Sequence, residues 1–120
     1  QLETQGHAYY QIEVNPDGKI FDADRHGRLN QRWKSNATVE TERGADFWRV
    51  VVRIPVVDAE EGAADPNHHV VGAKPGMDSP WYMNVGRSRV RPSGKTSWSF
   101  PHTGKRSYHV PERFAKMVIE

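Results

Sequence analysis

At 120 residues the chain is long enough for one domain with a buried core, and domains of this size hide about two-thirds of the surface of the unfolded chain. Lysine and arginine number 17 against 15 aspartate and glutamate residues, with the signs interspersed, so no basic stripe indicates a nucleic-acid-binding protein. The sequence contains no cysteine, which excludes disulfides and thiolate metal sites, and no apolar run approaches the roughly 20 residues that cross a bilayer.

The N-terminal third favours a β-hairpin. Strand-forming residues over 7–14 precede the turn Asn15-Pro16-Asp17-Gly18, and a short strand over 19–22 can pair back. Residues 22–30 are polar and punctuated by glycine. The alternation over 37–42 is typical of a weak, half-exposed strand.

Residues 47–54 carry the clearest strand pattern in the chain. One face has apolar residues and the other has mainly arginine, in the period of two that a pleated strand imposes: Trp48, Val50, Val52 and Ile54 against Arg49, Val51 and Arg53. This pattern predicts a central core strand with a buried Trp48. Pro55 ends the strand because proline cannot donate to the ladder.

The second half contains short elements separated by turn residues. We expect one helical turn over 56–61, a long loop over 62–80, strands over 81–87 and 96–100 around a turn at 89–95, a helical turn over 111–114 and a last strand over 115–119. Trp81 is expected in the core. The whole pattern predicts a single all-β domain over 1–120, an antiparallel β-sandwich.

Four motifs in this order resemble the C-terminal part of family 9 carbohydrate-binding modules. They are the tryptophan-led strand ending in Ile-Pro at 48–55, Trp-Tyr-Met-Asn-Val-Gly-Arg at 81–87, Ser-Trp-Ser at 97–99 and His-Val-Pro-Glu-Arg-Phe at 109–114. Tyr-Gln-Ile-Glu-Val-Asn at 10–15 is similar to the middle region of that family. Because members of the family are longer, the resemblance implies that the first strands are missing and that the chain is a fragment of a longer domain or protein.

The resemblance implies a non-catalytic sugar-binding module, accessory to a polysaccharide-active protein and extracellular, periplasmic or on the cell surface. Sugar-binding members hold a terminal sugar between two aromatic rings, one from the missing region and one at the position of Tyr108. They also use an arginine where this chain has Glu13, flanked by Gln11. The expected partner is a carbohydrate bound by a monomer, without nucleic acid or a membrane span.

A sugar site needs a flat aromatic ring together with side chains that donate and accept hydrogen bonds. The stretch from Trp81 to Phe114 is rich in both, and the preceding hairpin can add to it. The candidate ligand-binding residues are Tyr108, Trp98, Arg106, Asn84, Arg87, Glu13 and Gln11. Asn84 and Arg87 lie three apart on one expected strand, so their side chains should point to opposite faces.

Other site classes receive less support from the sequence. We expect no metal or cofactor, although Asp22-Ala23-Asp24 with Gly27 beyond is similar to a calcium loop that lacks its closing glutamate. The carboxylates form no recognisable glycosidase pair, and no seryl hydrolase motif is present, which argues against an enzyme.

Two other binding functions remain open. The locally basic run is interleaved with Trp98 and Tyr108, as in proteins that bind single-stranded nucleic acid: Arg87, Arg89, Arg91, Lys95, Lys105 and Arg106. The second alternative is a structural or protein-interaction sandwich without a sugar site. It is favoured because Glu13 stands where the sugar-binding members have an arginine.

Overall fold

A computed structural model describes residues 1–4, 9–105 and 107–119. The largest unit is a five-stranded sheet with the order β11-β8-β1-β2-β3. Adjacent strands in this sheet are all antiparallel. The strand bounds are β1 Leu2–Glu3, β2 Tyr10–Val14, β3 Ile20–Asp24, β8 Trp81–Met83 and β11 Ala115–Met117. The expected strands over 7–14, 19–22 and 115–119 therefore exist, with residues 7 and 8 outside the described part.

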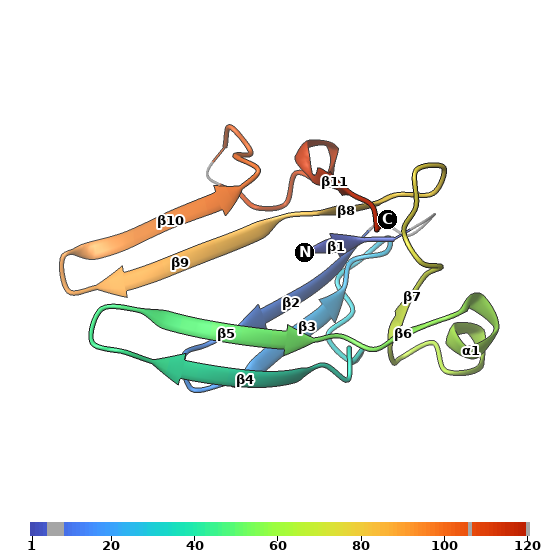
Figure 1. The fold of residues 1–120 in the computed structure, drawn as a ribbon, viewed down its shortest axis with the longest axis horizontal. Coiled ribbons are helices and arrows are strands. Elements are labelled where there is room, and N and C mark those ends of the chain that lie inside the picture. The colour runs from blue at the N-terminus through green and yellow to red at the C-terminus, as the bar shows by residue number, and fades with distance from the viewer. Residues whose placement is uncertain (5–8, 106, 120) are drawn as a thin grey trace.

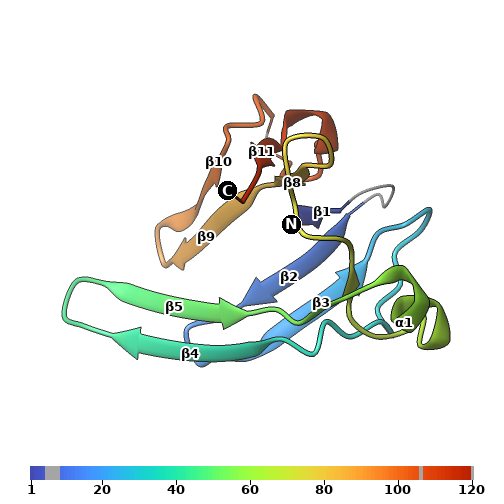
Figure 2. The same cartoon turned by 45° about the vertical axis from the view of Figure 1, so that its right-hand side comes forward.

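Two further hairpins have their turns at the same end of the molecule as the turn between β2 and β3 (Figure 1). One pairs β4 (Thr38–Arg43) with β5 (Trp48–Arg53), and the other pairs β9 (Val85–Arg91) with β10 (Gly94–Phe100). In Figures 1 and 2 the β9–β10 hairpin lies above the β4–β5 hairpin, which runs beside β2 and β3. The prediction of an all-β domain built from antiparallel strands is confirmed, and the arrangement is compatible with a sandwich.

The β2–β3 hairpin closes through the side chain of Asn15. Its Oδ1 accepts hydrogen bonds from the backbone N–H groups of Asp17 at 3.0 Å and Lys19 at 2.9 Å. Gly18 has φ 77°, a left-handed conformation that glycine adopts without strain. The turn chemistry seen in the sequence thus fixes the register of β2 against β3.

The core is small and centres on two stacked rings. Tyr10 and Trp33 have ring centroids 4.8 Å apart at an interplanar angle of 23°, and Val70 completes the cluster. Trp33 lies in no regular strand or helix, and its Nε1 donates to the carbonyl of His69 at 3.1 Å. Trp81 is buried as expected.

The prediction that 47–54 forms a central core strand is wrong. The residues Trp48, Val50, Val52 and Ile54 do share one face, but this face is only half-buried. Within the part of the chain that the structure describes, β5 pairs with β4 alone. The other face, which carries Arg49, Val51 and Arg53, is exposed to water. Trp48 is therefore half-buried rather than in the core.

Three local predictions need correction. The helix α1 spans Ala59–Ala64, because the carboxylate of Asp58 accepts from the Glu61 N–H at 2.9 Å and caps its start. The expected loop over 62–80 contains β7 (Val70–Val71), which pairs in parallel with β6 (Val56–Val57). The expected turn over 89–95 is tighter, because β9 continues to Arg91 and β10 begins at Gly94.

The helical turn over 111–114 is confirmed as the 3₁₀ helix η1 (Pro111–Arg113), with proline in its first position. Among the described residues no helix is long and apolar enough to cross a membrane.

Candidate functional site

A cavity of about 380 Å³ opens between β2 and β9. We call it the Tyr108 cavity. It is lined by Gln1, Gln11, Ile12, Glu13, Val14, Asn84, Gly86, Ser88, Lys95 and Tyr108. Four of the sequence-predicted residues, Gln11, Glu13, Asn84 and Tyr108, thus meet around one hollow although they come from distant parts of the chain.

Tyr108 is held against β9 by its ring and by its hydroxyl. The hydroxyl donates to the carbonyl of Arg87 at 2.9 Å and lies 3.3 Å from Ser88 Oγ. The ring covers Gly86, where an added Cβ would lie 3.1 to 3.2 Å from three ring carbons. Glycine at this position therefore lets the ring lie close to the strand, and Tyr108 becomes a half-buried platform on the cavity wall.

Asn84 joins β8 to β9 and is 2 % exposed. Its backbone N–H donates to the carbonyl of Gln1 at 3.0 Å, so the chain there is fixed. Its side-chain Nδ2 and Oδ1 are both buried and have no hydrogen-bond partner among the described residues. A buried amide without partners is costly, and this one lies on the wall of the cavity. Because both amide atoms are also shielded from solvent, a molecule in the cavity bonds them only when the Asn84 side chain turns towards it.

On the opposite wall, Gln11 and Glu13 share one face of β2. Arg25 Nε donates to Gln11 Oε1 at 2.8 Å, and Gln11 Nε2 donates to Glu13 Oε1. Because Arg25 can only donate, it fixes which end of the Gln11 amide faces Glu13. Glu13 is exposed and brings a carboxylate acceptor to the cavity.

His109 contacts Gln1, which lines the Tyr108 cavity. Its Nδ1 lies 2.8 Å from the hydroxyl of Tyr9 and 3.0 Å from Nε2 of Gln1. Burial and the nearby charge of Arg25 lower the pKa of His109, with Glu13 acting in the opposite direction. Among the described residues, the charged side chains that line the Tyr108 cavity are Glu13 and Lys95.

The remaining candidates lie elsewhere. Arg87 and Trp98 line a second hollow, and they are direct partners across the β9–β10 ladder. Asn84 and Arg87 thus line different hollows, as expected. The expected single strand over 81–87 is wrong, because the chain divides at Asn84 into β8 and β9, which belong to different sheets. Trp98 is 60 % exposed, and its hollow and that of Tyr108 lie on opposite faces of the hairpin. Arg106 lies outside the described residues.

Sequence reasoning missed Gly86, Ser88 and Lys95 as lining residues. Counting in steps of two from Asn84 would have found Gly86 and Ser88, because alternate residues of a strand share a face. Lys95 has no such signal, since its place depends on the register of β10 against β9.

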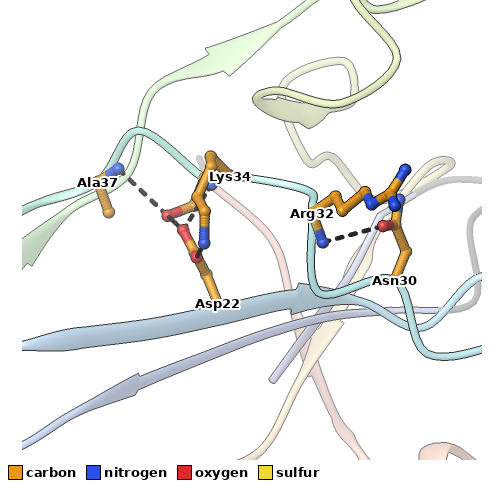
Figure 3. A network of polar contacts seen from close by, with 6 residues as sticks. Asp22, Asn30, Arg32, Lys34 and Ala37 are labelled. Atoms are coloured by element: carbon orange, nitrogen blue, oxygen red, sulfur yellow. Dashed lines mark hydrogen bonds and ion pairs between the residues drawn. The ribbon is translucent and has the colours of Figure 1, made fainter.

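The calcium-like motif is engaged within the protein. Asp22 accepts hydrogen bonds from Lys34 Nζ at 3.0 Å, the Ser35 N–H at 2.8 Å and Ser35 Oγ at 2.9 Å. Figure 3 shows its carboxylate facing the segment that carries Lys34 and Ala37. Burial alone would raise the pKa of Asp22, but these hydrogen bonds outweigh it and the pKa is lowered. Among the described residues, no three acidic or histidine side chains lie close enough together to hold a metal ion.

No protein-family model, curated protein or solved structure matches this chain. The resemblance to family 9 carbohydrate-binding modules therefore stays a prediction, and the function is argued from the Tyr108 cavity itself.

Proposed function

We propose that this domain is a non-catalytic carbohydrate-binding module that holds a sugar in the Tyr108 cavity. The observation that carries the proposal is the Asn84 amide: its donor and acceptor atoms are buried and unpaired, and the residue lines the cavity. A sugar hydroxyl both donates and accepts, so it matches this amide.

The rest of the lining suits the same ligand. Tyr108 offers a fixed aromatic surface for the apolar C–H face of a sugar ring, and Ser88, Gln11 and Glu13 offer polar groups for its hydroxyl rim. Glu13 is the single carboxylate among the described lining residues. Glycoside hydrolysis by the usual route needs two carboxyl groups, so the lining supports binding rather than turnover. We propose a role as an accessory module of an exported polysaccharide-active or cell-surface protein.

Calorimetric titration with mono- and oligosaccharides tests the proposal. We expect Tyr108→Ala to weaken binding by about tenfold or more, since the stacking surface is lost. Tyr82→Ala is the matched control, because Tyr82 is exposed on β8 and does not line the cavity. Equal affinity of the wild type and Tyr108→Ala would refute this site.

Asn84→Ala separates binding from stability. The substitution removes two unpaired buried polar atoms, so the free energy of unfolding should change by less than about 1 kcal/mol. Sugar affinity should fall because hydroxyl partners are lost. A variant that binds sugar normally would remove the observation on which the proposal depends.

A structural or protein-interaction domain is the second candidate, favoured by an apolar groove of about 370 Å³ between β2 and β5. Its apolar lining includes Ile12, Val14, Val52, Ile54, Met83 and Met117. A glycan array without hits on the folded protein would select this candidate over sugar binding.

A further inference from the structure

The second hollow, of about 470 Å³, lies on the face of the β9–β10 hairpin that points away from the Tyr108 cavity. We call it the arginine face. Its lining residues are Arg87, Arg89, Arg91, Thr96, Ser97 and Trp98. The three arginines are alternate residues of β9, so they project from one side of the strand about 7 Å apart.

Nothing in the described structure neutralises these arginines. Their direct partners on β10 are Trp98 opposite Arg87, Thr96 opposite Arg89 and Gly94 opposite Arg91, which carry no charge. None of the three forms an ion pair with a described residue. Like charges along one strand repel each other, so this face attracts an external anion.

The three arginines of the β4–β5 hairpin are also exposed, but each of them has an ion-pair partner. Arg49 pairs with Glu42, Arg53 pairs with Glu40 at 2.5 Å, and Arg43 pairs with Asp17 at 2.5 Å. The β4–β5 hairpin thus neutralises its arginines within the protein, and the β9–β10 hairpin leaves the same number available.

A broad aromatic surface adjoins the cations. Trp98 is 60 % exposed, although a tryptophan is usually well buried, and Thr96 lies on the same face of β10. An indole stacks on the apolar face of a sugar ring, and guanidinium groups bind carboxylate or sulfate through two parallel hydrogen bonds.

We propose that the arginine face is a second binding site, separate from the Tyr108 cavity, and that its ligand is an anionic polysaccharide. Trp98 stacks on a sugar ring, and the row of arginines binds successive sulfate or carboxylate groups along the chain. Single-stranded nucleic acid fits less well. Such sites stack successive bases on several aromatic residues, whereas Trp98 is the single aromatic among the described residues that line this face.

Affinity electrophoresis with two charged polymers tests the proposal, dextran sulfate supplying sulfate groups and polygalacturonate supplying carboxylates. Neutral dextran serves as the uncharged control. We expect the protein to bind at least one charged polymer, and which one it binds identifies the anionic group. The triple variant Arg87→Gln, Arg89→Gln, Arg91→Gln should weaken that binding by about tenfold or more, since several charge-assisted hydrogen bonds are lost.

The matched control is Arg43→Gln, Arg49→Gln, Arg53→Gln, which removes the same three charges from the other hairpin. It should change the affinity by less than about twofold, because these arginines are already paired. Trp98→Ala should weaken polysaccharide binding and leave binding of inorganic sulfate unchanged.

The proposal is overturned if neither charged polymer binds, if both triple variants lose affinity equally, or if single-stranded DNA binds more tightly than both polymers. These results are independent of the Tyr108 cavity, which is tested with neutral sugars and Tyr108→Ala.

Discussion

The β4–β5 hairpin pairs two strands of six residues, and the β9–β10 hairpin pairs two strands of seven, both in antiparallel register. They differ in what their faces contact. β5 turns a half-buried apolar face towards the sheet, and Ile54 just beyond it packs on the core. β9 and β10 leave Val85, Val90 and Phe100 more than half exposed. One hairpin is therefore part of the packed structure, while the other presents side chains to the outside.

The hairpins also differ in how they are attached. The segment leading into β4 is held by the Asp22 carboxylate, through three hydrogen bonds from Lys34 and Ser35. The β9 strand is held by Tyr108, whose hydroxyl donates to a single carbonyl. A buried carboxylate with three hydrogen bonds gives a strong attachment. A phenol on a strand surface gives a weaker one, and it leaves a ring available for ligands.

The largest expected effect follows from breaking the Asp22 attachment. Asp22→Asn replaces the charged acceptor by an amide, so we expect a loss of about 2 kcal/mol in the free energy of unfolding, measured with urea. Asp17→Asn should cost much less, because Asp17 is exposed and makes one surface ion pair. Equal losses in the two variants would contradict the role of burial.

Asp22 also predicts how the stability of the fold depends on pH. Because its folded pKa is depressed below the ordinary value of 3.8, the carboxylate contributes stability above about pH 4. That contribution is lost as the pH falls through the folded pKa, when the proton cancels the charge. In Asp22→Asn, the decline in stability below pH 4 should be shallower than in the wild type. A decline of unchanged slope would show that other carboxylates account for it.

The next largest effect tests how differently the two hairpins are packed. Ile54→Ala should cost about 1 to 2 kcal/mol, roughly half the value for a fully buried isoleucine, because Ile54 is half-buried against the core. Val90→Ala should cost less than about 0.5 kcal/mol, since Val90 is 77 % exposed. Thermal and urea unfolding measure both, and a costly Val90→Ala would place β9–β10 within the packed structure.

A smaller effect concerns the weak attachment at Tyr108. Gly86→Val puts a branched side chain where the ring lies, so the ring must move and sugar affinity should fall by about tenfold, or about 1.4 kcal/mol. Gly76→Ala is the control, because an added Cβ at Gly76 meets no atom within 4 Å. Normal sugar binding by Gly86→Val would show that the position of the ring is not needed.

The smallest expected effect is that of a surface ion pair. A double-mutant cycle on Glu42 and Arg49 should give a coupling of about 0.2 to 1 kcal/mol that decreases with salt, because both side chains are exposed. Arg89→Gln should leave stability unchanged or raise it slightly, since it relieves repulsion without breaking a pair. A destabilising Arg89→Gln would reveal an internal partner for that arginine.

Local chemistry in the sequence determined the all-β character, the turn at Asn15 to Gly18, the alternation over β5 and the proline-led turn at Pro111. These features depend on φ and ψ preferences and on the period of two, which act between neighbours in the chain. Tertiary structure alone decided that Trp33 rather than Trp48 completes the core, because burial depends on which distant segments cover a ring.

The candidate site likewise depends partly on the sequence and partly on the tertiary structure. The sequence identified Tyr108, Asn84, Gln11 and Glu13 by residue type and by resemblance, but only folding brought them around one cavity. It also suggested Trp98 and Arg87, which the register of β9 against β10 places on the other face. A strand has two faces, and which distant segment covers each of them is a property of the whole fold.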